Sequence, residues 1–153
     1  YVGFSAHGEE AALAFMERSK LPLASVLFPV NATTWSQGHW GPRIMEAAQQ
    51  RGLARLALKA LAKQRWPEGV EKTWPKCWYE PHDDPETVER FLRWTLAQPV
   101  TAAIPPGHKE LFEMAMQAAE RLAPMSEAEQ ADALAETEGL VPLFRDEAAA
   151  SSA

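Results

Sequence analysis

The runs Ser25-Val-Leu-Phe-Pro-Val30 and Leu53-Ala-Arg-Leu-Ala-Leu-Lys59 decide the fold, because a helical stretch lies between them. An unbroken apolar run of this length is typical of a parallel strand that is buried on both faces. The helical stretch begins at Gly41-Pro42, where proline is favoured in the first turn, and it ends at Gly52. This pattern predicts two parallel strands that are joined by a helical crossover.

The same alternation occurs before and after this unit. A short apolar run at the start of the chain precedes the helical stretch 8–19, and Val100-Thr-Ala-Ala-Ile104 precedes the helical stretch 108–122. Strand-to-helix crossovers of one hand predict parallel strands in sequential order with helices on one face only. We place these four strands within residues 1–6, 24–30, 53–59 and 100–105. A closed barrel of the TIM (β/α)8 type needs eight strands and about 250 residues, so the sequence predicts an α/β fold equal to half of such a barrel.

The remaining segments divide the chain into regions. Residues 59–83 are rich in Trp and Pro, and Asp84 with Pro85 predicts the start of the helix that precedes the fourth strand. Ser126-Glu-Ala-Glu129 predicts a capping box for a last helix that ends near Gly139. We therefore expect three regions, which are a β/α half-barrel at 1–123, a helical extension at 124–145 and a disordered tail at 146–153.

Composition and charge exclude several classes of protein. The chain has 153 residues and a net charge of -6, which disfavours nucleic acid and anionic membrane surfaces as partners. Cys77 is the single cysteine, so neither an internal disulfide nor a multi-thiolate metal site is expected, which fits a cytoplasmic location. No apolar stretch reaches about 18 residues, the length of a membrane span. Because the chain begins with Tyr1 and enters a strand at once, we expect it to be part of a longer protein.

Polar residues gather where the predicted strands end, at Ser5, His7, Asn31 and Lys59, with Gly107 and His108 at the last turn. The carboxyl ends of parallel strands form the face at which α/β proteins bind ligands. A lysine at the end of an apolar strand needs a carboxylate, a phosphate or water, so Lys59 is either a ligand-binding or catalytic residue or half of a structural ion pair. The Ile104-Pro-Pro-Gly107 turn offers free amides to an anion, although such turns are common before helices.

Other residue types leave alternatives open. The spacing of the histidines and acids matches no metal-ligand pattern, so no metal site is expected. Cys77 has no evident base partner that would make it a reactive thiol. The tryptophans of the two long loops either stack on a substrate or pack the loops onto the sheet; they are Trp35, Trp40, Trp66, Trp74 and Trp78.

At these strand ends the chain resembles the second half of the aldo/keto reductase family. Gly3-Phe4-Ser5-Ala6-His7 is similar to the family's Ile-Gly-x-Ser strand, and Phe28-Pro29-Val30-Asn31 is similar to its next strand, which ends in Asn. Leu56-Ala-Leu-Lys59-Ala-Leu61 resembles the Met-Lys-Pro-Leu strand of one branch, and Ala103-Ile-Pro-Pro-Gly107 resembles the last strand with its Ile-Pro-Gly turn. The resemblance covers residues 1 to about 123. It implies the C-terminal half of a TIM barrel.

The resemblance also implies an oxidoreductase that uses NADP or NAD to transfer hydride to or from a carbonyl substrate. By this resemblance Ser5 contacts the nicotinamide carboxamide, Lys59 and Leu61 lie along the diphosphate, and Gly107 with His108 meet the adenosine-phosphate end. The family's residues that act on the carbonyl come from earlier strands, so the resemblance assigns this chain no catalytic residue. We therefore expect the chain alone to be inactive and to need either a missing N-terminal half-barrel or self-association. The alternative is a non-catalytic β/α module for interaction or scaffolding.

Overall fold

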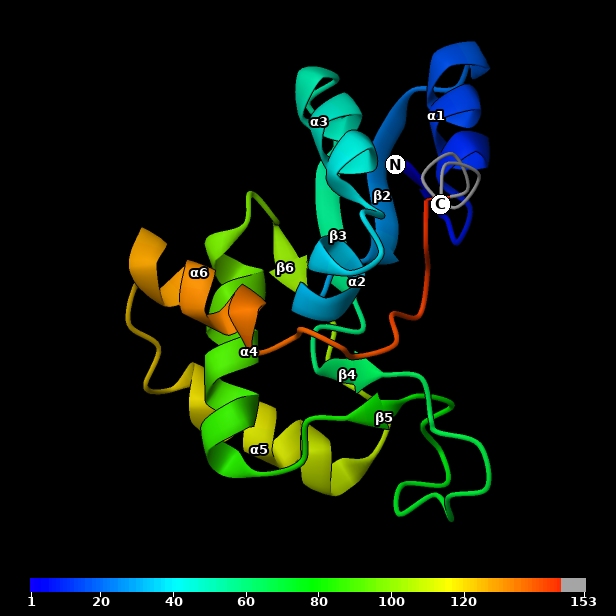
Figure 1. Ribbon diagram of the computed structural model, residues 1–153. Coiled ribbons are helices and arrows are strands. Elements are labelled where there is room, and N and C mark those ends of the chain that lie inside the picture. Colours follow the sequence, from blue (N-terminus) through cyan, green and yellow to red (C-terminus); the bar gives the residue numbers. More distant parts are fainter. Residues whose placement is uncertain (147–153) are drawn as a thin grey trace.

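The computed structural model describes residues 1–146, and a four-stranded sheet lies at its centre (Figure 1). The strands follow one another across the sheet in the order β1 (Val2–Ser5), β2 (Leu23–Pro29), β3 (Ala54–Leu58) and β6 (Ala102–Ala103). Every neighbouring pair is parallel. The prediction of four parallel strands in sequential order is therefore confirmed.

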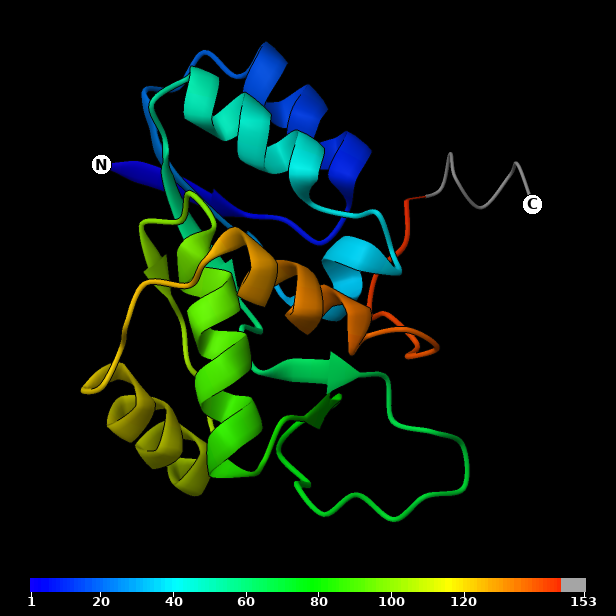
Figure 2. The ribbon, with the colours of Figure 1, turned by 60° about the vertical axis from the view of Figure 1, so that its left-hand side comes forward.

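One face of the sheet carries the main core. Val26, Phe28 and Ala57 have no exposed surface and share one apolar cluster with residues of several helices. The helices of this cluster are α1 (Glu9–Arg18), α2 (Ala32–Ser36), α3 (Pro42–Gln50), α4 (Pro85–Ala97) and α6 (Glu127–Ala135). Full burial of a side chain such as Phe28 contributes roughly 1.5–3 kcal/mol. Figure 2 shows α1 and α3 side by side on the same side of the first three strands.

The helix starts follow their sequence signals. The Asp84 carboxylate accepts hydrogen bonds from the amides of Glu86 and Thr87 at the start of α4, and Ser126 forms the expected capping box at the start of α6. The last helix ends at Ala135 rather than near Gly139. The Thr137 hydroxyl donates to the carbonyl of Leu134, and such side-chain bonds to nearby backbone compete with continued helix.

The opposite face of the sheet is left without a core. Leu27, Leu56 and Leu58 alternate with the buried residues of β2 and β3, are only partly buried, and belong to none of the apolar clusters of residues 1–146. Ile104 is 38% exposed. Within that same described part, no strand pairs with the outer edges of β1 and β6. A sheet that curls and then stops therefore leaves one apolar face and two edges open.

Two parts of the long loops have structure that the sequence did not predict. Residues 32–36 form the short helix α2 (Ala32–Ser36), and the Trp-rich loop contains an antiparallel pair, β4 (Ala62–Gln64) and β5 (Glu80–Pro81). The fourth strand of the main sheet is only two residues long. Prolines 105 and 106 follow it and lack the amide hydrogen that would extend the ladder. Helix α5 (Lys109–Ala119) then packs beside α4.

The end of the described chain crosses back over the carboxyl ends of the strands, and we call residues 140–146 the C-terminal strap (Figure 1). The Arg65 amide donates to the carbonyl of Val141 at 3.0 Å, and the Asp146 amide donates to the carbonyl of Gly38 at 2.8 Å. Leu143 is buried against Ala62 and Tyr79. The predicted helical extension is thus packed onto the half-barrel. The predicted tail is residues 146–153; its first residue, Asp146, is part of the strap, and residues 147–153 lie outside the described part of the chain.

Candidate functional site

The carboxyl ends of β1 and β3 bring two side chains of the sequence prediction together. His7 follows β1, Lys59 follows β3, and the Lys59 Nζ lies 3.2 Å from the His7 Nε2. Strand β2 lies between these two strands in the sheet, so the contact spans the rim of three strands. Two of the polar residues at the predicted strand ends therefore meet at this rim.

Lys59 does not take part in a structural ion pair with a carboxylate of the described chain. Its Nζ lies over two aromatic rings, at 5.2 Å from the centroid of Trp78 and at 5.6 Å from that of Phe144, which are cation–π distances. Among the described residues no carboxylate forms an ion pair with it. Burial lowers the pKa of the Lys59 ammonium. Its φ of 60° lies in the left-handed region, which is uncommon for a residue other than glycine.

His7 is held by the strap. Its imidazole stacks on the Phe144 ring with 5.6 Å between centroids and 14° between planes. Burial, followed by the charge of Lys59, lowers the pKa of His7. The neutral imidazole is therefore the favoured form near neutral pH, and its unprotonated nitrogen can accept a hydrogen bond from the Lys59 ammonium.

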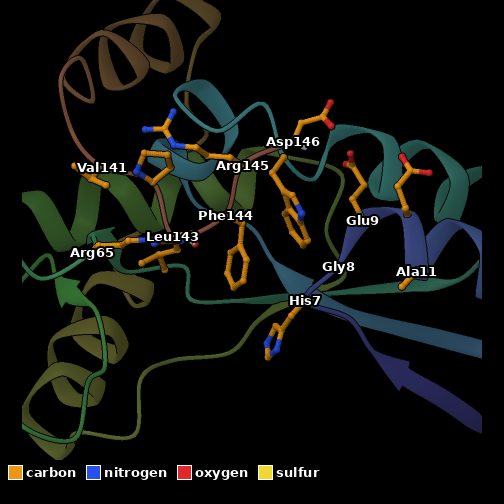
Figure 3. Close-up of a pocket in the computed structure, with 13 residues that line it drawn as sticks. His7, Gly8, Glu9, Ala11, Arg65, Val141, Leu143, Phe144, Arg145 and Asp146 are labelled. Carbon is orange, nitrogen blue, oxygen red and sulfur yellow. Dashed lines mark hydrogen bonds between the residues drawn. The ribbon is translucent and has the colours of Figure 1, made fainter. Parts of the chain in front are cut away.

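A cavity of about 580 Å³ opens beside His7, between the start of α1 and the strap (Figure 3), and Lys59 is not part of its wall. His7 and Phe144 belong to its wall, and so do Glu9, Arg65 and Asp146. Figure 3 shows the Phe144 ring and the His7 imidazole on the same side of the strap. Its volume is within the range of small-molecule sites.

Glu9 is the most buried carboxylate beside this cavity, with 4% of its side chain exposed. One carboxylate oxygen accepts from the Gly41 amide at 3.1 Å, and the other accepts from Arg43 at 3.3 Å. Burial raises the pKa of Glu9, against the opposing effects of the Gly41 amide and the Arg43 charge. The carboxylate thus joins the starts of α1 and α3, a role that the sequence pattern did not indicate beyond an acidic first turn.

Of the other residues of the predicted cofactor site, Ser5 lines a shallow pocket together with His7, and the rest lie apart from this pair. Ser5 is exposed at the end of β1. The Leu61 side chain is buried among Val88 and Leu92 of α4, so only its backbone could meet a ligand. Gly107 and His108 lie at the start of α5, on the far side of β3 from β1.

The start of α5 has one unsatisfied polar atom. His108 Nδ1 lies 2.8 Å from a Glu110 oxygen, whereas its Nε2 is buried without a hydrogen-bond partner. The Trp74 ring meets the imidazole edge-on at 4.8 Å. A Cβ added at Gly107 would meet no atom within 4 Å, so the turn has open space in front of it.

Several sequence alternatives resolve towards packing. Asn31 is buried and caps α2, with its side-chain oxygen accepting from the Thr34 amide at 2.9 Å. Trp40 is buried, whereas Trp78 is 53% exposed beside Lys59. Cys77 is buried, which raises the pKa of its thiol. No cluster of potential metal ligands occurs in residues 1–146.

The sequence prediction missed the aromatic wall of the rim. Phe144 comes from a strap of ordinary composition, more than a hundred positions after His7 in the chain, so no local pattern could place it at the strand ends. Trp78 was one of five loop tryptophans that the sequence could not tell apart as substrate-stacking or loop-packing residues. Contacts between such distant segments are set by the fold alone.

Comparisons with known proteins support the fold and leave the family unassigned. No protein-family model matches the chain, and no curated protein sequence matches it. The chain is similar in structure to the aldo-keto reductase AKR11C1 from Bacillus halodurans, with a TM-score of 0.59 and 17% identity to the holo form. The apo form gives 0.60 and 15%. Each match covers 96% of this chain but only 52% and 53% of that protein, so the chain spans about half its length.

These matches show that the chain has the fold of half of an aldo-keto reductase barrel. The α/β half-barrel predicted from the sequence is therefore confirmed. Among residues 1–146, no helix is long and apolar enough to cross a membrane.

Proposed function

We propose that this chain is the C-terminal half of an NAD(P)-dependent oxidoreductase of the aldo-keto reductase type, which acts on a carbonyl substrate. The observation that carries the proposal is a half-barrel whose strand ends present Lys59 without a carboxylate partner, 3.2 Å from His7, which lines a cavity of about 580 Å³. A cationic rim of this kind suits an anionic dinucleotide. The fold match to AKR11C1 supports the same reading.

The rim residues fit parts of a dinucleotide. The exposed Ser5 hydroxyl has no hydrogen-bond partner in the described part of the chain and can contact the nicotinamide carboxamide. Lys59 would lie along the diphosphate, with Leu61 contributing its backbone only. Gly107, with open space in front of it, and His108 would meet the adenosine-phosphate end at the start of α5. When bound, the dinucleotide, NADP or NAD, would supply the hydride chemistry.

Proton transfer to a carbonyl needs an acid within hydrogen-bond reach, and the proposal assigns none to this chain. The catalytic acid would come from the other half of the barrel, supplied by an N-terminal half or by self-association. The proposal includes a cytoplasmic location and neither nucleic acid nor membrane as a partner, in keeping with the net charge of -6.

The test measures NADPH binding by calorimetry with the whole natural protein and its Lys59→Ala variant. Loss of one charge-assisted contact costs about 1.5–3 kcal/mol, so affinity is expected to fall roughly tenfold or more. Lys63→Ala is the matched control, because Lys63 pairs with Glu80 at 2.7 Å away from the rim contact. Unchanged affinity in Lys59→Ala would contradict the role of Lys59.

The same preparation separates binding from turnover. The 153-residue chain alone is expected to show no carbonyl-dependent loss of nicotinamide absorbance. Robust turnover by this chain would show that it carries its own proton donor.

The alternative is a non-catalytic interaction module, which the open apolar face around Leu56 favours. A natural protein that binds no dinucleotide but holds a partner through that face would support the module instead.

A further inference from the structure

Lys59 differs from the lysines of this chain that form ion pairs. Lys63 pairs with Glu80 at 2.7 Å, and Lys109 pairs with Glu113 at 3.4 Å. Both contacts favour the protonated ammonium. Lys59 is half-buried, and its one hydrogen-bond partner among residues 1–146 is the His7 ring.

The backbone fixes the position of this amine. Lys59 stands at the first residue after β3, in a left-handed conformation with φ of 60°. Such conformations cost free energy in residues other than glycine and persist where the surrounding structure holds them. The backbone of Lys59 is consequently held at the rim, and its Nζ lies over the rings of Trp78 and Phe144.

His7 supplies a proton acceptor at this point. Its Nε2 lies 3.2 Å from the Lys59 Nζ, and it is the titratable group in direct contact with that amine. Burial lowers the pKa of the Lys59 ammonium, and burial together with the charge of that ammonium lowers the pKa of His7. Lys59 therefore gives up its proton more readily than an exposed lysine does, and an amine of this kind beside a base is the arrangement that makes a lysine nucleophilic.

We propose that Lys59 is a nucleophilic amine that captures aldehydes covalently as an imine, with His7 as its proton acceptor. The Nζ lone pair attacks the carbonyl carbon, and the C=O electron pair moves to oxygen. One N–H proton passes through His7 to that oxygen and gives a carbinolamine. Loss of the hydroxyl with the remaining N–H proton releases one water and leaves the C=N bond, so no oxidant or reductant is needed.

The surroundings favour an aromatic aldehyde. The rings of Trp78 and Phe144 lie within 5.6 Å of the amine, and both offer faces on which an aryl group can pack. Trp78 is 53% exposed, so its ring is open to such a group. This proposal is independent of dinucleotide binding.

The test uses the 153-residue chain, benzaldehyde and sodium cyanoborohydride near neutral pH, without any dinucleotide. Reduction converts each imine into a stable benzyl-lysine, and peptide mass spectrometry then gives the initial rate at every lysine. Lys59 is expected to react several-fold faster than the exposed Lys20 and Lys72. A rate at Lys59 no faster than at those two residues would overturn the proposal.

Two variants separate the contributions. Lys59→Arg retains a cation for the diphosphate of the proposed function but cannot form the imine, so it should lose this labelling while the whole protein still binds NADPH. His7→Phe keeps a ring against Phe144 and removes the nitrogen. It is expected to slow labelling of Lys59 and to change the pH profile of the rate. An unchanged pH profile in a variant with wild-type circular dichroism would refute the role of His7.

Discussion

At the residue scale, Glu9 shows how a carboxylate is used to join two helices. Its side chain is almost fully buried. Its carboxylate accepts hydrogen bonds from the backbone amide of Gly41, the residue that precedes α3, and from the Arg43 guanidinium. Negative charge at a helix N-terminus is favourable, which offsets part of the burial cost. The effect of burial on the Glu9 carboxyl is nevertheless larger than the opposing effects of Gly41 and Arg43, because the pKa of Glu9 is raised from its ordinary value.

The pH dependence of stability follows from that direction. A folded-state pKa above the unfolded one means that the folded state binds the proton more tightly, so stability falls as pH rises from the ordinary glutamate range through the raised pKa. We expect Glu9→Gln to remove this slope in urea unfolding measured at several acidic pH values. Glu10→Gln is the matched control, since Glu10 also pairs with Arg43 but is 71% exposed. Identical slopes in the two variants would contradict the assignment.

The sequence predicted Lys59 at the rim because a lysine that ends an apolar strand is unusual, and parallel strands bring such ends together. It could not decide between a ligand residue and an ion pair, since that depends on which carboxylates lie nearby in the fold. Leu61 shows a second limit. The resemblance places it along a diphosphate, but a strand-end position does not say that its side chain turns into the α4–α5 core.

At the element scale, helix starts were predictable and the strap was not. Asp84 and Ser126 cap their helices through bonds to residues two or three positions away, so the sequence contains the whole signal. The strap is held by backbone bonds to residues 38 and 65 and by ring contacts of Phe144. The β4–β5 pair likewise depends on two short segments separated by a long loop. None of these contacts has a local sequence signature.

The strap is expected to control the environment of His7. Phe144→Ala removes a single ring that stacks on His7 and also contacts Trp40, with 5.1 Å between the Phe144 and Trp40 centroids. Loss of a large partly buried aromatic side chain should destabilise the chain by about 1–3 kcal/mol. The pKa of His7, measured by NMR titration, should rise towards its ordinary value as water reaches the ring. Val141→Ala, at an exposed position of the strap, should change neither quantity.

At the scale of the whole molecule, the fold follows from the alternation of strands and helices, and its incompleteness follows from their number. Four parallel strands joined by three crossovers of one hand curl the sheet but do not close it. The helix-covered face is a complete core, whereas the opposite face keeps its leucines partly exposed. The matched reductase is about twice as long as this chain. The described chain is therefore a sheet with one helix-covered face and one apolar face that remains open to burial against another chain or segment.

Self-association of the 153-residue chain is the expected consequence. Unpaired strand edges recruit other chains, and burial of each leucine of the open face is worth up to about 1.5–3 kcal/mol. Light scattering at micromolar concentration should find dimers or larger species, and Leu56→Lys, at the centre of that face, should shift them towards monomer. Leu21→Lys is the matched control, because Leu21 is 55% exposed in a loop before β2. Thermal unfolding of both variants checks that the fold survives. A wild-type chain that stays monomeric under these conditions would contradict the prediction that the open apolar face and the unpaired strand edges drive self-association.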